Sequence, residues 1–419
     1  MSTPPSTPDS TPSGESKPQH RQPASSMLTP PTSPRQSRSS SNISDLAISS
    51  SPSYPRPQQL FLRFENAKLN PIDTNVTQRK DPIEPSVAEC PFDVEILKDE
   101  RGRDAIFGTG AWSTVYKASN HARSRNVSAA LTPPLSPTIL TPVLVAVKKP
   151  ARRDAVAILK SEAKILTYLR GVPESERYVV PFYGVVDEAA IVLEALPFSL
   201  EEHIRKCAVI AAQNFSTRTM MDPIVGSSAR WFQLAQQLVS ALAWLHNRAQ
   251  VVHGDIKPGN ILLSRVRGFG TEITFEPLFA DFSSSQRLDL DETTANTLSA
   301  VTREYTAPEL LSSTVLRNPA STATTASDVF SMALTLLVTA TGQLLVYSGS
   351  MFQRQAMATQ GWMVLSHARN GEGGTRVPRF GIVEKVLERA VLRADMDRVS
   401  AQEWLRIVET LAKGEPAKI

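Results

Sequence analysis

Residues 253–260 (HGDIKPGN) place an acid, a cation and a carboxamide in one short, turn-rich segment. Asp255 can orient an incoming hydroxyl and accept its proton, and Lys257 can neutralise charge that develops on a transferred phosphoryl group. Asn260 offers an oxygen ligand to magnesium, which prefers such donors. Groups of these types at this spacing predict phosphoryl transfer.

Two segments upstream carry groups that the same chemistry requires. Residues 106–115 contain Gly108 and Gly110, which lack a Cβ, so their backbone N–H groups can approach phosphate oxygens closely. The apolar run 145–148 ends in Lys148 and predicts a buried strand that presents an ammonium group to those oxygens.

Two more segments supply the acids that must hold these cations. Glu162 lies within 155–169, where Val156, Leu159, Ala163, Leu166 and Leu169 recur at helical spacing. We therefore expect a helix whose Glu162 carboxylate holds Lys148. Asp281 follows an apolar stretch and is a second candidate metal ligand.

Together, and in chain order, these segments resemble the motifs of eukaryotic protein kinases. Residues 278–283 are similar to the DFG element, with Ser283 in the glycine position, and 302–309 to the end of an activation segment. Asp328 fits the helix that anchors the catalytic loop, and Arg398 fits the cation that pairs with Glu309. The resemblance implies an α+β, bilobal protein-kinase fold with a small β-rich lobe and a mainly helical lobe, and it implies ATP and Mg²⁺ as cofactors.

The resemblance also implies a role for each site residue. Asp255 and Lys257 would be catalytic, together with Lys148 held by Glu162, and Asn260 and Asp281 would bind the metal. The nucleotide would contact Gly108, Gly110, Ser113, Val115, Ala146, Lys148, Glu194, Leu196 and Leu262, of which Glu194 and Leu196 belong to the expected hinge between the lobes.

The implied activity is transfer of the ATP γ-phosphoryl group to Ser or Thr hydroxyls of protein substrates. Lys257, combined with Thr302 ahead of Tyr305, is similar to Ser/Thr kinases rather than to tyrosine kinases. His253 is expected to pack and hydrogen-bond, not to act as a base. The other histidines, such as His203 and His246, are expected at the surface or at helix ends.

Several residues depart from the kinase pattern. Gly254 replaces the arginine that in many kinases holds the phosphate of an activated segment, so regulation by such phosphorylation is not expected. Ser113, Ser283 and Ala333 also depart. They motivate an alternative function, a pseudokinase scaffold that binds nucleotide or partners without efficient catalysis. Every residue that would touch phosphate, metal or hydroxyl is retained, which favours the enzyme.

Composition divides the chain into regions. Residues 1–57 are rich in Ser, Thr and Pro, which predicts a disordered tail. Residues 58–91 predict an extended linker that either docks on the folded domain or forms a short exposed motif. The kinase domain would occupy 92–419, with a small lobe at 92–194, a disordered insertion at about 119–142 and a large lobe at 197–419.

A short sequence in the tail recurs in the insertion. Residues 131–137 (LTPPLSP) match 28–34 (LTPPTSP) at six of seven positions. Each copy resembles a doubly phosphorylated degron, in which proline-directed kinases would modify Thr29 and Ser33, or Thr132 and Ser136, for an F-box ubiquitin-ligase adaptor. The alternative is compositional bias in a disordered segment.

Global composition excludes some classes of partner. A net charge of +4 over 419 residues makes no case for nucleic-acid binding. Cys90 and Cys207 lack metal-ligand spacing and favour a reducing compartment. No apolar run has the length of a bilayer span, so we expect no membrane partner and a cytoplasmic or nuclear location, or both.

Overall fold

The structure is a computed structural model that describes residues 86–121, 143–267, 273–289, 302–316, 322–361 and 363–414. All of them belong to the unit Lys80–Ile419. The predictions made for residues 1–57, for most of 58–91, and for both degron-like repeats lie outside the described residues.

The small lobe is built on a six-stranded antiparallel sheet. Its strands are β1 (Asp93–Ile96), β2 (Ile106–Thr109), β3 (Ser113–His121), β4 (Leu144–Pro150), β5 (Phe182–Val186) and β6 (Ala190–Glu194). Their order is β1-β3-β4-β6-β5, and β2 pairs with β3. β3 extends through His121, into the range expected for the insertion, because Ser119, Asn120 and His121 pair with β1.

Successive side chains of the central strands point to opposite faces of the sheet, and one of these faces packs into a small core. Val145 and Val147 of β4 are buried, as is Val192, which pairs with Val147 in the neighbouring strand β6. Side chains two residues apart share a face of a strand. Lys148 and Ala146 therefore lie on the face opposite to the two valines, which is the face of the site.

Helix α2 (Ala155–Arg170) packs against this sheet. Leu159, Ala163, Leu166 and Leu169 are buried, as the helical spacing predicted, and Glu162 lies on the same buried stripe with 1% of its surface exposed. The predicted helix is confirmed, and Gly171 follows its last residue.

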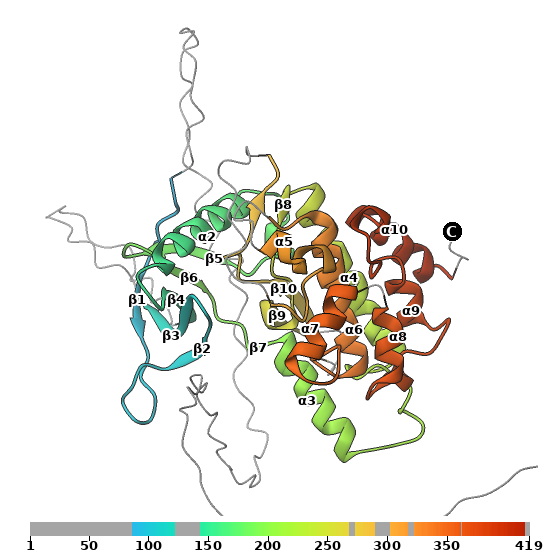
Figure 1. The fold of residues 1–419 in the computed structure, drawn as a ribbon. Helices are drawn as coiled ribbons and strands as arrows, with labels where there is room; N and C mark the ends of the chain where they lie inside the picture. The colour runs from blue at the N-terminus through green and yellow to red at the C-terminus, as the bar shows by residue number, and fades with distance from the viewer. Residues whose placement is uncertain are drawn as a thin grey trace, which may run out of the picture. The chain divides into compact units, whose positions relative to one another are not determined.

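The large lobe is mainly helical (Figure 1). Its helices are α3 (Leu200–Gln213), α4 (Ser228–Asn247), α5 (Ser313–Leu316), α6 (Thr325–Thr341), α7 (Met351–Gln360), α8 (Val364–Asn370), α9 (Ile382–Leu387) and α10 (Ala401–Ala412). Short strands complete it: β7 (Phe198–Ser199), β8 (Val251–Val252), β9 (Ile261–Arg267), β10 (Ile273–Phe279) and β11 (Gln286–Arg287). They form the sheets β10-β9-β7 and β11-β8.

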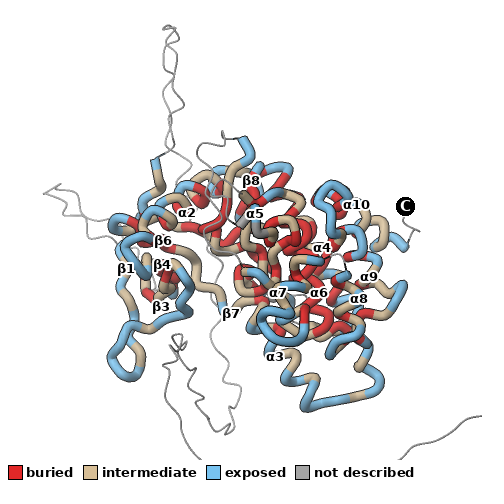
Figure 2. Tube along the Cα trace, viewed as in Figure 1, coloured by how far each residue is buried: buried red, intermediate tan, exposed pale blue. Residues whose placement is uncertain are grey.

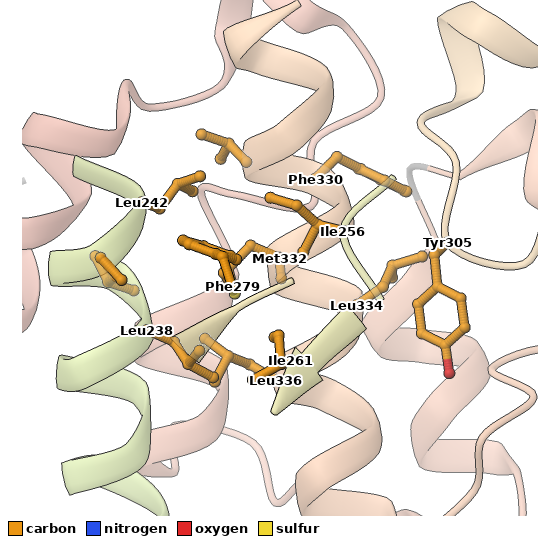
Figure 3. Packing of buried hydrophobic residues seen from close by; sticks show 14 of the residues in the cluster. Leu238, Leu242, Ile256, Ile261, Phe279, Tyr305, Phe330, Met332, Leu334 and Leu336 are labelled. Carbon is orange, nitrogen blue, oxygen red and sulfur yellow. The ribbon is translucent and has the colours of Figure 1, made fainter. Parts of the chain in front are cut away.

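Helix α6 forms the centre of this lobe. Its residues from Ser327 to Thr341 are all buried, and a helix that is apolar on all sides belongs in a core. Figure 3 shows Phe330, Met332, Leu334 and Leu336 of α6 packed among side chains from α4, β9 and β10. Figure 2 shows buried residues concentrated along α4 and α6.

The helix is bounded at both ends by residues that suit its termini. Thr324 and Ser327 form a capping box at the start, in which each side chain accepts a hydrogen bond from the other residue's backbone N–H. Gly342, with φ +81°, ends it. The expected α+β bilobal architecture is confirmed. Among the described residues, no helix is long and apolar enough to cross a membrane.

Candidate active site

Lys148 of β4 lies between two carboxylates that come from distant parts of the chain. Its Nζ is 2.8 and 2.7 Å from the two oxygens of Glu162 and 2.8 Å from Oδ1 of Asp281. Burial alone would lower the pKa of Lys148, but the carboxylates of Asp281 and Glu162 outweigh it and hold that pKa above its ordinary value. The predicted pair of Lys148 and Glu162 is thus formed, and Lys148 remains a cation.

Asp281 and Glu162 share this one ammonium group; the Glu162 side chain is fully buried, whereas that of Asp281 is 38% exposed. Burial opposes ionisation of Asp281, but Lys148 beside it holds the pKa of Asp281 well below its usual range. Burial raises the pKa of Glu162. Glu162 also accepts a hydrogen bond from the backbone N–H of Phe282 (3.2 Å), which ties α2 to the segment that carries Asp281.

The catalytic-loop residues form a second cluster. Nζ of Lys257 donates to Oδ2 of Asp255 (2.6 Å) and to Oγ1 of Thr302 (2.8 Å). The Thr302 hydroxyl in turn donates to Oδ1 of Asp255 (3.0 Å). Three side chains from two segments are therefore locked in one closed hydrogen-bond ring.

Asn260 and Asp281 are brought together by a hairpin. Asn260 immediately precedes β9, Asp281 follows β10, and the backbone N–H of Ala280 donates to the carbonyl of Asn260 (2.9 Å). Nδ2 of Asn260 donates to the backbone carbonyl and the side chain of Asp255, which leaves the amide oxygen as a ligand. These two oxygen donors fit a hard divalent cation that takes its other ligands from phosphate and water.

Within the described part of the chain, no three His, Cys, Asp or Glu side chains gather as a metal-binding group.

Asp328, in the first turn of α6, holds the catalytic loop through hydrogen bonds to its backbone. Its two oxygens accept hydrogen bonds from the backbone N–H groups of His253 (2.7 Å) and Gly254 (3.0 Å). Nε2 of His246 lies 3.1 Å from Oδ2 of Asp328. His246 lies in the last turn of α4, at a helix end as expected, and is only 5% exposed. It is buried against Asp328, which is remote in sequence.

His253 packs between aromatic rings. Its ring centroid is 4.9 Å from that of Phe282 and 5.4 Å from that of Phe279. Burial lowers the pKa of His253, so the imidazole stays neutral, and its Nε2 lies 3.1 Å from the carbonyl of Ala280. Leu166 and Phe182 belong to the same buried cluster.

The predicted nucleotide-contacting residues of the small lobe share one sheet face. Val115 pairs with Lys148 across β3 and β4, and Ala146 lies two residues before Lys148. Gly108 lies in β2, and the N–H of Gly110 donates to the carbonyl of Ser113 (2.8 Å) in a tight turn. These residues thus border the face that carries the Lys148 ammonium.

The remaining nucleotide-contacting residues lie where the lobes join. Glu194 ends β6, and Leu196 follows in the connection to β7. Leu262 of β9 pairs with Ser199 of β7, so it lies beside that connection. Every predicted site residue is therefore found on an element that borders the junction of the lobes.

Sequence reasoning missed the packing of the glycine-rich loop. The guanidinium of Arg152 lies 4.7 Å from the ring centroid of Trp112, and the backbone N–H of Ala151 donates to the Trp112 carbonyl (2.8 Å). These contacts attach the tip of the loop to the connection between β4 and α2. Cation–π pairs leave no spacing signal, because they depend on tertiary proximity alone.

Arg398 and Glu309 form an ion pair in the large lobe, as the motif order predicted. Nη1 and Nη2 of Arg398 each lie 2.6 Å from one oxygen of Glu309. The geometry is bidentate, which matches the planar guanidinium to the carboxylate.

Comparison with known proteins agrees with this architecture. A family model described as the protein kinase domain matches residues 139–406, more than half of the chain. The chain therefore belongs to the protein kinase family, whose domain binds ATP and a divalent cation and phosphorylates proteins. The match begins after the glycine-rich loop, so β1, β2 and β3 lie outside the matched residues.

Two curated relatives come from Arabidopsis thaliana. One, a probable L-type lectin-domain containing receptor kinase, is 36% identical over 112 residues, which cover 26% of this chain and 14% of the relative. The other, a G-type lectin S-receptor-like serine/threonine-protein kinase, is 31% identical over 114 residues, which cover 27% and 11%. The chain thus spans only a small part of the length of these relatives.

Proposed function

We propose that this chain is a catalytically competent protein serine/threonine kinase that transfers the γ-phosphoryl group of ATP to protein hydroxyls. The observation that carries the proposal is the closed ring of Asp255, Lys257 and Thr302, formed beside the triad of Lys148, Glu162 and Asp281. Both clusters are formed in the same structure. Catalysis of phosphoryl transfer depends mostly on positioning of the reacting groups and on electrostatic stabilisation.

Asp255 would orient the acceptor hydroxyl and take its proton. Its carboxylate is fixed by Thr302 on one oxygen and by Lys257 and Asn260 on the other. Lys257 is close enough to stabilise negative charge that develops near Asp255 during transfer. Thr302 would connect Asp255 and Lys257 to the activation segment through its hydroxyl.

Lys148 would bind the nucleotide phosphates as a permanent cation. Glu162 orients it, and Asp281 remains an ionised ligand because its pKa is depressed. Asn260 and Asp281 would hold Mg²⁺, which would neutralise charge on the phosphates of ATP, the donor of the phosphoryl group.

The hydrogen-bond ring of Asp255, Lys257 and Thr302 supports a preference for Ser and Thr hydroxyls in the substrate. Lys257 and Thr302 are the residues whose resemblance is to Ser/Thr kinases, and they contact each other at 2.8 Å. One of the two relatives carries a serine/threonine-protein kinase name.

The scaffold alternative rests on the departures at Ser113, Gly254, Ser283 and Ala333. None of these positions supplies a charge to the two clusters. The backbone N–H of Ser283 still donates to Oδ1 of Asp281 (3.4 Å), so serine keeps the contact that orients the metal-binding carboxylate.

The test is phosphate transfer by the purified full chain with Mg²⁺, labelled ATP and casein as a generic substrate, followed by phosphoamino-acid analysis. Asp255→Asn should lower kcat by about a thousandfold or more, while leaving ATP affinity largely intact. The matched control is Asp187→Asn, the same change at an exposed turn with positive φ that Asn tolerates.

Phosphoserine and phosphothreonine from the parent, lost in Asp255→Asn and kept in Asp187→Asn, support the proposal. Equal transfer by the parent and Asp255→Asn contradicts it. A parent that binds ATP without transfer supports the scaffold.

A further inference from the structure

A cavity of about 300 Å³ lies in the large lobe, apart from the residues of the candidate active site. Its lining residues come from the end of α6, the connection between α6 and α7, α7 itself, and α8 with the residues that follow it. Its lining includes Leu337, Tyr347, Arg354, His367, Ala368 and Glu372. A volume of this size is within the range of small-molecule sites.

Two polar groups in this wall have no hydrogen-bond partner among the described residues. They are the hydroxyl of Tyr347 and Nε of Arg354, both shielded from solvent. Tyr347 as a whole is 3% exposed. Buried polar groups are nearly always paired, because an unpaired one loses its hydration without compensation. Two unpaired donors beside one cavity point to a ligand that accepts hydrogen bonds.

The charges of the lining indicate an anionic acceptor. Burial raises the pKa of Tyr347, so its hydroxyl keeps its proton and can donate. Arg354 is a half-buried cation, and its Nη1 donates a hydrogen bond to the Gly349 carbonyl (2.7 Å). The carboxylate in the lining, Glu372, belongs to an exposed residue, where solvent screens its charge.

The cavity wall also has an apolar part, beside polar lining residues that include Thr341, Gln343 and Asn370. Leu337 and Ala368 are buried, with 1% and 6% exposure, and Val346 is partly buried. The ring of His367 stands edge-on to that of Tyr347, at 5.5 Å between centroids. Such a wall suits an aliphatic or aromatic body attached to the anionic head.

We propose that this cavity is a binding site for a small amphiphilic carboxylate, whose head pairs with Arg354 and the Tyr347 hydroxyl and whose apolar body lies against Leu337 and Ala368. The two donors shielded in the wall become its partners when the connection that carries Tyr347 adjusts around the ligand. Gly342 and Gly349 lie at the two ends of this connection, and glycine, which has no Cβ, can change its backbone dihedral angles with less steric hindrance than other residues.

The same connection contacts the segment that would receive the protein substrate. The Tyr305 hydroxyl donates to the carbonyl of Leu344 (2.8 Å), and Nη1 of Arg303 donates to Oε1 of Gln355, next to Arg354 (2.8 Å). A ligand that fixes the connection and α7 should therefore fix residues 302–305. This regulatory part rests on the proposed kinase function, and it predicts a change in KM for the protein substrate with KM for ATP unchanged.

Binding is tested on the full chain without any activity readout. The probe is 4-phenylbutyrate, together with the saturated carboxylates from hexanoate to decanoate, and the uncharged control is 4-phenylbutyramide. Thermal shift and ligand-observed NMR should detect the carboxylates and not the amide. Arg354→Gln should weaken binding by about tenfold or more, and the control Arg406→Gln, at an exposed arginine of α10, should not.

Tyr347→Phe separates loss of the hydroxyl from misfolding. It should leave the free chain as stable as the parent or more so, since an unpaired hydroxyl is removed, yet reduce the thermal shift that the carboxylate produces. Binding of the amide as strong as that of the acid, no binding by any carboxylate at millimolar concentration, or undiminished binding in Arg354→Gln overturns the site.

The regulatory part has its own outcome. With casein as substrate, saturating carboxylate should change KM for casein by about fivefold or more in the parent, and not in Arg354→Gln. Binding without this change overturns the coupling and keeps the site. A chain that binds the carboxylate but transfers no phosphate contradicts the proposed function alone.

Discussion

Gly254 lies directly against the backbone carbonyl of Ser284: a Cβ at Gly254 would stand 2.3 Å from that oxygen. The glycine has φ +80°, where L side chains are strained, and its N–H is held by Asp328. The missing arginine of the catalytic loop is therefore accompanied by a local backbone that has no room for one.

Restoring that arginine should destabilise the protein rather than restore regulation. We expect Gly254→Arg to lower the free energy of unfolding by about 2–4 kcal/mol, from the left-handed conformation and the close approach together. Urea denaturation measures this. Gly102→Arg is the control, because Gly102 has φ +72° and a Cβ there would meet no atom within 4 Å. Equal losses at both positions would contradict the close approach as a cause.

The ion pair of Arg398 and Glu309 should contribute to stability far more than an exposed pair. Arg398 has a fully buried side chain, so Arg398→Gln leaves Glu309 without its bidentate partner. We expect a loss of about 2–4 kcal/mol in unfolding free energy. In Arg389→Gln, which breaks an exposed pair with Glu403 at 3.6 Å, the loss should stay below about 1 kcal/mol. Chemical denaturation of the two variants decides, and similar losses would refute the ranking.

Removing the Thr302 hydroxyl should open the ring that orients Asp255 and Lys257. If the proposed function holds, Thr302→Ala should lower kcat by about tenfold or more with little change in KM for ATP, and Thr302→Ser should keep most activity. Thr306→Ala is a control, since the Thr306 hydroxyl donates only to the backbone of Thr302. Steady-state kinetics would exclude a positioning role if Thr302→Ala and Thr302→Ser behaved alike.

Neutral His253 should make the fold sensitive to mild acid. Its pKa is lowered in the folded state, so the unfolded chain binds the extra proton first and stability falls as pH drops below about 6.5. Replacing the ring by His253→Phe removes this titration. The variant should lose stability between pH 7.5 and 5.5 less steeply than the parent, by at most about 1.4 kcal/mol per pH unit. Identical slopes in denaturation series would rule out His253 as the titrating group.

Local pattern was enough to predict the elements that carry the site. Leu159, Ala163, Leu166 and Leu169 recur at helical spacing, and the helix they form, α2, spans Ala155–Arg170 as expected. The apolar run before Lys148 forms β4, in which the residues from Val145 to Lys148 are all buried, as a continuous apolar run predicts.

Contacts between remote residues left no such signal. His246 was expected at the surface or at a helix end; it lies at the end of α4, but its contact with Asp328, 82 positions away, was not predicted. Arg152 over Trp112, and the cavity wall with Tyr347 and Arg354, likewise join residues whose types are ordinary for a surface. Neither periodicity nor composition reports which side chains meet when separate helices pack.

By itself the sequence determined which chemical groups this protein has and in what order: glycines and Lys148 for phosphate, Asp255 and Lys257 for the hydroxyl, Asn260 and Asp281 for a metal. Only the tertiary structure decided that Lys148 meets Asp281, 133 positions away, at 2.8 Å. That contact depends on two lobes closing on each other, and the free energy for it comes from the burial of side chains throughout both cores rather than from the residues that react.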